Sequence, residues 1–179
     1  MTTNTPHQAH QDDIGCDMAH GLVPSPTGGR RLVAVFASPV AHQLIHFGAH
    51  VGFEVMIVDP DLERAAATNN CVTAFSMAKL DEATDVVVTD HDRAELGELL
   101  AQALRATTRW IGVMGSLRHT APHIEALRER GFADAEIARV HRPIGLDIGS
   151  HSPGEIALST VAGLLADRNG RSGGPFTTA

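Results

Sequence analysis

Residues 32–36, Leu-Val-Ala-Val-Phe, form an apolar run that no polar side chain interrupts. A short run of this kind is typical of a strand covered on both faces, as in a parallel sheet. Apolar residues then recur at helical spacing, and Gly52 ends that predicted helix. A second apolar run follows at residues 54–58. Strand, helix and strand in this order predict the first unit of a parallel sheet.

The same alternation continues along the chain. Asp92 is expected to cap a helix that has Glu95 at its third position, and Ser152-Pro153-Gly154-Glu155 is typical of the start of a final helix. The remaining expected elements are strands over residues 71–75 (weak), 85–89 and 109–113, and helices over residues 120–130 and 134–140. The predicted fold class is α/β, a Rossmann-like three-layer α/β/α domain with a mostly parallel sheet.

Length and composition indicate one folded domain. The chain has 179 residues, of which 43% are hydrophobic and 20% are charged, and this is enough for one compact core. Residues 1–29 and 169–179 are polar and lack periodicity, so we expect a mobile N-terminal arm and a flexible C-terminal tail. The Rossmann-like domain is therefore expected over residues 30–168.

Charge and hydropathy narrow the class of protein. The formal net charge of −7 argues against nucleic acid as the main ligand. The longest unbroken apolar stretch, residues 32–37, is far shorter than a membrane span, and the first dozen residues lack the pattern of a signal peptide. Cys16 and Cys71 cannot form a disulfide framework. We therefore expect a soluble, cytoplasmic protein with no membrane partner.

Ligands of parallel α/β sheets bind beyond the carboxyl ends of the strands. After the first strand, a dinucleotide-binding protein carries a glycine-rich loop, but here the chain reads Phe36-Ala37-Ser38-Pro39-Val40. Ser38 can cap the helix, and Pro39 removes one backbone N–H donor. The loop therefore lacks both the glycines and one of the donors that a phosphate-binding loop uses. Asp59, about 20 residues on, stands where an acid would meet the ribose of NAD(P), or it is a solvated or capping acid. NAD(P) binding is an alternative that the missing glycines weaken.

Two later loops carry polar side chains after predicted strands. In Thr89-Asp90-His91-Asp92, a nearby carboxylate would favour the charged form of His91, which could then donate a proton or contact an anion. An ordinary loop role for His91 and a capping role for Asp92 are the alternatives. In the second loop, Gly115, Ser116 and Arg118 describe an anion site before a helix, or an ordinary turn with an exposed arginine.

The segment from residue 141 to residue 151 is harder to explain as a mere connection. Gly145 and Gly149 bracket Asp147 in a loop with apolar residues at alternate positions, so we expect the loop to pack inward while turning tightly. Asp147 is suited to hold the backbone groups of such a loop, and a role in ligand chemistry is the alternative. His151 ends the segment.

Other histidines and cysteines give weaker signals. His42, His46 and His50 form a stripe opposite the apolar face of their predicted helix, with no acid between them. This pattern favours a solvated stripe or a subunit contact over a metal site, and no metal ligands are predicted. Cys71 has no cationic surroundings in the sequence and is expected to be a small core residue.

Several strings together resemble one family. They are Trp110-Ile-Gly-Val-Met-Gly-Ser-Leu-Arg118, Pro143-Ile-Gly-Leu-Asp-Ile-Gly149 and Pro153-x-Glu155-Ile-Ala157, with Val58-Asp59 and the Thr-Asp-His-Asp loop also fitting. The chain resembles the C-terminal Rossmann domain of the XdhC and CoxI family over residues 31–167. The resemblance implies an accessory or maturation factor for a molybdenum hydroxylase such as xanthine dehydrogenase or carbon monoxide dehydrogenase. Such a factor is thought to bind the molybdenum cofactor, assist its sulfuration and deliver it to the apoenzyme.

The resemblance also implies site residues and partners. Gly115, Ser116 and Arg118 would grip the anionic end of a molybdopterin, and His91, Asp147 and His151 would line its pocket. All candidate cofactor-binding residues are Ser38, Asp59, His91, Asp92, Gly115, Ser116, Arg118, Gly145, Asp147, Gly149 and His151. Expected partners are a molybdenum hydroxylase apoenzyme, a separate protein of the N-terminal XdhC type or a sulfur donor, and a second copy of the chain.

Two departures from the family pattern leave rival functions open. The family usually has Gly-Ala-Gly where this chain has Ala37-Ser38-Pro39, and we expect the short arm to replace the domain that usually precedes this one. The rivals are an NAD(P)-dependent oxidoreductase that uses Asp59 for the ribose, and a non-catalytic interaction module with a decayed pocket. No catalytic residue is assigned.

Overall fold

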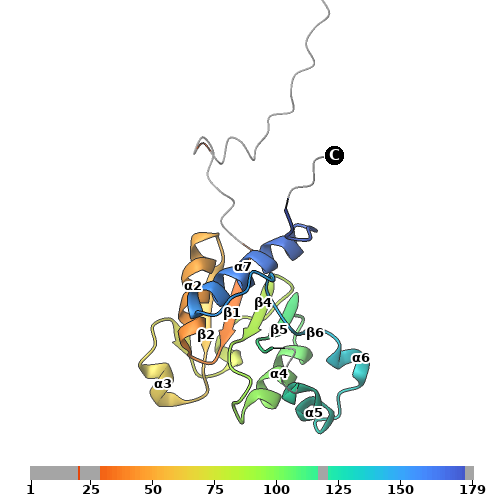
Figure 1. Ribbon diagram of the computed structural model, residues 1–179. Coiled ribbons are helices and arrows are strands. Elements are labelled where there is room, and N and C mark those ends of the chain that lie inside the picture. The colour runs from red at the N-terminus through yellow and green to blue at the C-terminus, as the bar shows by residue number, and fades with distance from the viewer. Residues whose placement is uncertain (1–19, 21–28, 117–120, 176–179) are drawn as a thin grey trace, which may run out of the picture.

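The structure is a computed structural model, and it describes residue 20, residues 29–116 and residues 121–175. Six strands form one sheet in which every neighbouring pair is parallel, in the order β3-β2-β1-β4-β5-β6 (Figure 1). The strands are β1 (Arg31–Val35), β2 (Glu54–Val58), β3 (Cys71–Val72), β4 (Thr84–Val88), β5 (Trp110–Val113) and β6 (Val140–His141).

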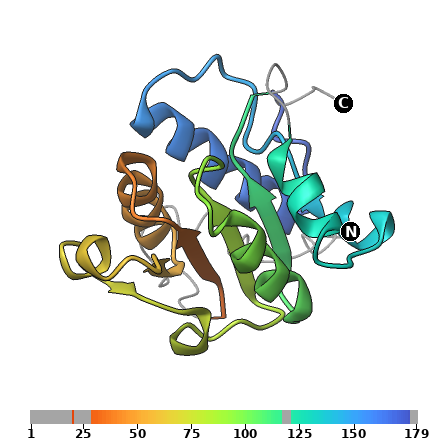
Figure 2. The ribbon, with the colours of Figure 1, turned by 90° about the horizontal axis from the view of Figure 1, so that it is seen from below.

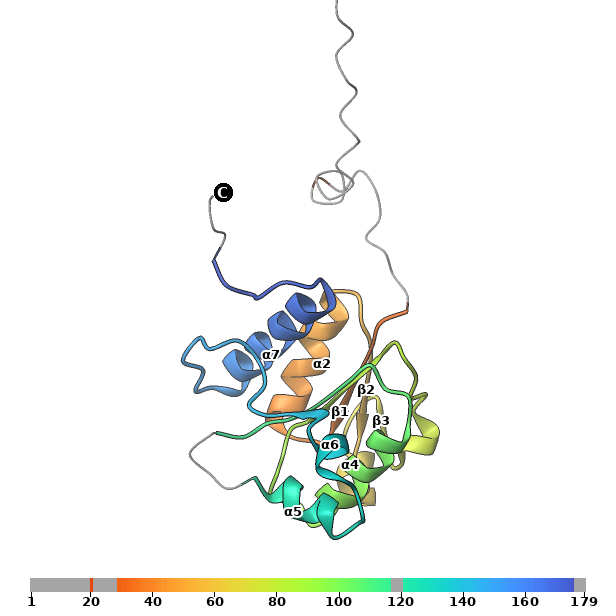
Figure 3. The same cartoon turned by 90° about the vertical axis from the view of Figure 1, so that its right-hand side faces the viewer.

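Helices cover both faces of this sheet (Figures 2 and 3). They are α2 (Pro39–His50), α3 (Leu62–Ala66), the 3-10 helix η1 (Phe75–Met77), α4 (Leu96–Arg105), α5 (Pro122–Arg128), α6 (Asp134–Ile137) and α7 (Pro153–Arg168). Helices α2 and α7 pack against each other on one face, and α4 and α5 lie on the other. The predicted three-layer Rossmann-like fold is confirmed, and the sheet is entirely parallel.

The strands supply a core to each face because successive side chains point to opposite sides. On β1, Leu32 and Ala34 belong to the cluster under α2 and α7, while Val33 and Val35 belong to the cluster under α4. All four are buried. Burial of each Val or Leu side chain stabilises the fold by about 1.5–3 kcal/mol, which explains the apolar run without polar alternation.

Two helix starts follow from the sequence. Ser38 accepts the amide hydrogen of Ala41 at 3.0 Å, with Pro39 in the first helical position of α2. At α7, the Ser152 hydroxyl accepts from the Glu155 amide at 3.3 Å, and the Glu155 carboxylate accepts from the Ser152 amide at 3.0 Å. This capping box confirms the predicted start of the final helix.

The expected cap at Asp92 is wrong. Helix α4 begins at Leu96, and no side chain of the described residues, Glu95 included, caps it by a hydrogen bond. Instead, Asp90 accepts the amide hydrogen of Asp92 at 3.0 Å and pairs with Arg93 at 2.8 Å, so the loop continues before the helix starts. The Asp92 side chain is 85% exposed.

The short helix predicted over residues 134–140 is longer than the observed one. Helix α6 ends at Ile137, and Val140 and His141 form the edge strand β6, which the sequence did not predict. The weak strand at residues 71–75 is reduced to Cys71–Val72, and Phe75 starts η1. The helix expected over residues 120–130 is the shorter α5.

The strand order places the loops of interest at one edge of the sheet. Since all strands are parallel, their carboxyl ends meet at the same edge, here called the carboxyl edge. Strands β1 and β4 are neighbours although β2 and β3 lie between them in sequence, and ligands of doubly wound sheets bind beyond such a switch point.

An ion-pair cluster fixes α7 at the opposite edge. The fully buried carboxylate of Asp85 accepts from Arg109 Nε at 2.6 Å and from Arg168 Nε at 2.8 Å. Arg168 is the last residue of α7, so this cluster ties the end of that helix to β4.

In the described part of the chain, no helix is both long and apolar enough to cross a membrane.

Candidate functional site

The turn between β1 and α2 is closed by its own hydrogen bonds. Phe36 is buried and has a φ of +73°, so the chain turns sharply there without glycine. The Ala37 amide donates to Asp59 Oδ2 at 2.8 Å, and the Ser38 hydroxyl lies 2.9 Å from that of Thr89. The polar groups that would face a pyrophosphate are therefore bound to protein atoms.

The Asp59 carboxylate is fully engaged as well. It is 0% exposed, accepts from the Asp61 amide at 3.0 Å and receives two hydrogen bonds of 2.9 Å from the Arg64 guanidinium. Burial alone would raise the pKa of Asp59, but the hydrogen bonds from Arg64 and from the Ala37 and Asp61 amides outweigh it and hold this pKa below its usual value. A ribose hydroxyl would have to displace Arg64 to reach this carboxylate.

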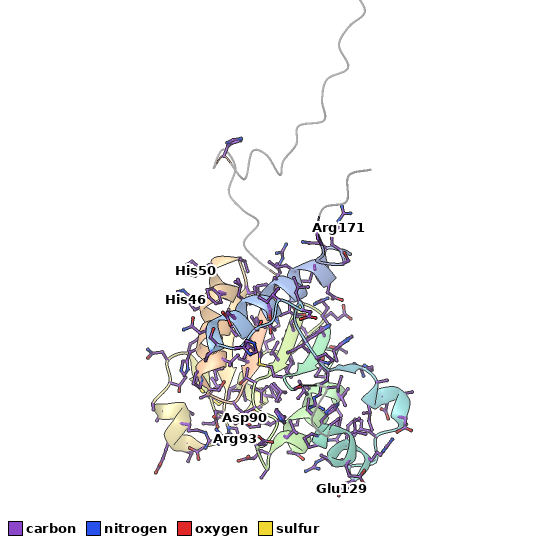
Figure 4. All side chains as sticks on the ribbon, in the orientation of Figure 1. His46, His50, Asp90, Arg93, Glu129 and Arg171 are labelled. Atoms are coloured by element: carbon purple, nitrogen blue, oxygen red, sulfur yellow. The ribbon has the colours of Figure 1, made fainter. Side chains whose placement is uncertain are left out.

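The loop after β4 contributes His91 and Asp92. His91 Nε2 lies 3.7 Å from Asp92 Oδ1, while Asp90 pairs with Arg93 in the same loop (Figure 4). His91 is one of the charges that act on the buried His123 of α5. Neither His91 nor Asp92 lines the crevice described next.

A crevice of about 710 Å³ joins the end of β5 to the loop between β6 and α7. Ser116 supplies the wall after β5, residues 143–151 form most of the rest, and Ile156 and Ser159 of α7 complete it. Of the residues expected to form the anion site after β5, Ser116 shares this crevice with the Asp147 loop, whereas Gly115 does not line it. Figure 3 shows the loop projecting beside α7.

Arg142 supports the Ser116 side of the crevice. Its Nη2 donates to the Ser116 carbonyl at 3.0 Å. Its guanidinium lies over Gly115, where an added Cβ would sit only 2.6 Å from Arg142 Nε. A side chain at Gly115 would displace this guanidinium, and Gly115 itself does not line the crevice. The role of Arg142 could not be predicted from local sequence, because its partner lies 26 residues away.

The loop between β6 and α7 is anchored at both ends. Gly145 has a φ of +86°, and an added Cβ would lie 2.8 Å from Ser159 Oγ, so only glycine lets the loop approach α7 this closely. The Leu146 amide then donates to the Ser159 carbonyl at 3.1 Å. At the other end, the His151 amide donates to Glu155 at 2.9 Å.

The middle of this loop differs from the expectation of inward packing. Ile148 is 53% exposed, whereas Ile144 is partly buried against the α2 and α7 core. Asp147 is exposed and has no hydrogen-bond or ion-pair partner within the described ranges, so it does not hold the loop backbone. Gly149 has a φ of +68°, and an added Cβ there would meet only open space.

The other candidates lie away from the crevice. His46 and His50 are exposed on α2 with their rings 4.6 Å apart (Figure 4). Burial raises the pKa of the Cys71 thiol, which does not favour a reactive thiolate. Among the residues with a described position, no group of three His, Cys, Asp or Glu side chains could hold a metal ion.

The predicted site residues that the structure describes therefore divide among four places. The crevice brings together Ser116, Gly145, Asp147, Gly149 and His151. Ser38 lies in the turn after β1 and Asp59 follows β2 beside that turn, whereas His91 and Asp92 lie in the loop after β4. Gly115 lies beneath Arg142, and Arg118 falls outside the described residues.

The fold and the crevice define the class as a Rossmann-like domain with a pocket at the carboxyl edge of its sheet. Comparison with known families makes the assignment specific. The chain belongs to the XdhC Rossmann domain family, whose pattern matches residues 32–164.

Individual relatives agree with this family. The chain is similar to the uncharacterized protein YqeB of Escherichia coli (strain K12), with 31% identity over 87% of this chain and 29% of that protein. It is also similar to a protein of Bacillus subtilis (strain 168) described as a probable xanthine dehydrogenase subunit, with 26% identity over 93% of this chain and 50% of that protein.

A solved structure shows the same likeness. A crystal structure described as a xanthine dehydrogenase from Bacillus halodurans matches with a TM-score of 0.64 and 25% identity. The match covers 83% of this chain and 44% of that one. The chain thus spans half or less of the length of each of these three relatives.

Proposed function

We propose that this domain is an accessory factor that binds the molybdenum cofactor, or a related phosphorylated pterin or nucleotide, for a molybdenum hydroxylase of the xanthine dehydrogenase or carbon monoxide dehydrogenase type. Family membership and the names of two relatives support the link to xanthine dehydrogenase. The crevice that unites Ser116 with the Asp147 loop is the observation that carries the proposal.

The crevice has the size and polarity for such a ligand. Its volume of about 710 Å³ falls within the range of about 300–1,000 Å³ that small-molecule sites occupy. Ser116, Ser150 and His151 place polar groups along its wall. Arg142 lies behind Ser116, and its buried Nε has no hydrogen-bond partner, nor does any described carboxylate pair with this guanidinium. The unneutralised positive charge favours an anionic group at this wall.

The residues of this chain would hold and orient the ligand. The Ser116 wall, backed by Arg142, would receive the phosphate end. His151 would contact the ligand from the loop before α7, and Gly145 would keep that loop against the helix. The molybdenum cofactor, with its metal, would supply the redox chemistry of the client enzyme.

Isothermal titration calorimetry of the full chain with purified molybdopterin tests the proposal. We expect one binding event, weakened about tenfold in His151→Ala because one polar contact is lost. His46→Ala, an exposed histidine on α2, is the matched control and should bind like the native protein. Absence of heat with the native protein would overturn the molybdenum cofactor as the ligand.

NAD(P) is the rival cofactor. The occupied Asp59 carboxylate and the Ala37 amide bonded to it argue against this rival. Titration of NADH against the chain, followed by nicotinamide fluorescence, separates the two proposals. Enhanced fluorescence that depends on Asp59 would favour the oxidoreductase, whereas an unchanged signal would remove it.

Partners follow from the same proposal. A carrier of this cofactor needs a client apoenzyme, and sulfuration needs a sulfur donor. A separate protein of the N-terminal XdhC type and a second copy of the chain are further proposed partners. Pull-down of the client with the cofactor-loaded chain, compared with the empty chain, tests delivery. A non-catalytic interaction module would capture the client equally well in both states.

A further inference from the structure

Asp147 is the unengaged carboxylate of the crevice. The neighbouring carboxylates at the carboxyl edge are bound to protein atoms: Asp59 by Arg64, Asp90 by Arg93, and Glu155 by the His151 and Ser152 amides. Asp147 lines the same crevice as Ser116 and, throughout the described ranges, has neither a hydrogen bond nor an ion pair. Its two oxygens are therefore available to a ligand.

The position of Asp147 is restricted although its side chain is free. One residue earlier, the Leu146 amide is bonded to the Ser159 carbonyl of α7. Three residues later, the Ser150 hydroxyl donates to the Glu155 carbonyl at 3.3 Å. Both anchors are on α7, so the loop presents Asp147 from a fixed base. A preorganised group loses less entropy when it binds a ligand.

The crevice has a negative charge on its wall, at Asp147, and a positive charge behind its wall, at Arg142. Arg142 brings a positive charge to the segment at Ser116, while Asp147 brings a negative charge to the loop before α7. A ligand that is anionic throughout would be repelled at Asp147. The matching ligand has an acidic group at one end and a group rich in N–H donors at the other.

We propose that Asp147 determines specificity by accepting two parallel hydrogen bonds from a 2-amino-4-oxopyrimidine ring, the ring edge that pterins and guanine share. This proposal rests on the function proposed above and names the part of the ligand that the crevice reads. The amino group and the adjacent ring N–H of such an edge are neighbouring donors. A carboxylate meets two parallel donors with both oxygens, as it meets the fork of a guanidinium.

Apolar side chains around Asp147 suit the faces of such a ring. Ile144, Ile148 and Ile156 line the same crevice. Ile148 is 53% exposed, and a flat ring bound over it would remove this apolar surface from water. A polar edge at Asp147 and apolar faces at the isoleucines together describe a heterocycle rather than a sugar.

Two ligand pairs test the reading of the ring edge with the full chain. The first pair is 6-hydroxymethylpterin and 6-hydroxymethyllumazine, which carries an oxo group in place of the 2-amino group. The second pair is GMP and IMP, which lacks that amino group. Calorimetry should show that the amino compound of at least one pair binds about 10- to 100-fold more tightly, because a hydrogen bond to a charged acceptor is lost in its partner. The pair with the stronger binding identifies the ring as a pterin or a guanine.

Two variants assign the preference to Asp147. Asp147→Asn keeps the shape but replaces one acceptor oxygen with a donor, so the preference should fall to within about twofold. Glu129→Gln, an exposed carboxylate at the end of α5 (Figure 4), should keep the native preference. Equal binding within both pairs, no binding of either amino compound, or an undiminished preference in Asp147→Asn would overturn the inference.

Titration of molybdopterin into the same proteins separates this inference from the proposed function. If the native chain and Asp147→Asn bind molybdopterin equally, the inference fails and the cofactor proposal stands. If the native chain does not bind molybdopterin but distinguishes GMP from IMP through Asp147, the cofactor proposal fails and the reading of the ring edge stands.

Discussion

The Nη2 atom of Arg142 donates to the carbonyl oxygen of Ser116 at 3.0 Å, which joins the residue after β6 to the turn after β5. This bond and the close contact of Arg142 with Gly115 hold one wall of the crevice. The two loops that the proposed ligand must touch are therefore coupled through one side chain.

Removal of the Arg142 side chain should weaken ligand binding in the crevice. In Arg142→Ala we expect the affinity for molybdopterin to fall about tenfold, because the Ser116 wall loses its support and its positive charge. Arg142→Lys should recover only part of the loss, since lysine lacks the planar fork. Arg171→Ala, an exposed arginine beyond α7 (Figure 4), is the control for charge alone. Equal weakening in both alanine variants would indicate a general charge effect.

Gly145 should tolerate no side chain. Alanine at this position combines a φ of +86° with a Cβ only 2.8 Å from Ser159 Oγ. Urea denaturation of Gly145→Ala should show a loss of about 1–3 kcal/mol in the free energy of unfolding. Gly154→Ala, in the first turn of α7 with open space around it, should change this free energy by less than about 0.5 kcal/mol. Similar values for the two variants would mean that the loop does not press against α7.

The ion pairs of Asp85 should contribute far more than a surface pair. Asp85→Asn leaves Arg109 and Arg168 without their buried partner, so we expect a loss of about 3 kcal/mol in the free energy of unfolding. Asp134→Asn removes the exposed pair with Arg128 and should cost less than about 1 kcal/mol. Thermal unfolding by circular dichroism measures both, and comparable shifts would contradict this assignment.

Stability should depend on pH through His123. This side chain is 3% exposed; burial lowers its pKa below the usual 6.5, and the charges of Arg142 and His91 lower it further. As the pH falls below 6.5, the unfolded chain therefore binds a proton at His123 more readily than the folded chain does. The contribution of this group to the free energy of unfolding is at its full value above pH 6.5 and declines below it. His123→Asn should show a flatter decline in urea midpoints below this pH than His46→Asn. An identical slope in both variants would contradict the prediction.

The sequence predicted the main strands and helices better than the loops and short elements that connect them. The apolar runs of β1 and β4 and the Ser152–Glu155 capping box depend on local patterns, and the structure confirms them. The predicted start of α4 was wrong because the Asp90 carboxylate accepts hydrogen bonds from the Asp92 amide and from the Arg93 side chain. Strand β6 was missed because a two-residue strand depends on its pairing with β5 and not on its own composition.

The candidate site shows the same division. Polar residues after predicted strands could be located from the sequence because parallel strands end at one edge. Their partners could not, since the contact of Arg64 with Asp59 and that of Arg142 with Ser116 depend on how the loops pack. For this reason Asp59 looked available to a ribose, and Asp147 looked suited to a structural role.

Amide resonances of the isotope-labelled chain, followed during titration with molybdopterin, test the central claim most directly. We expect the largest shifts at Ser116 and at residues 144–151, with small shifts at Ala37 and Ser38. Shifts concentrated at Ala37, Ser38 and Asp59, or no shifts at saturating ligand, would contradict it.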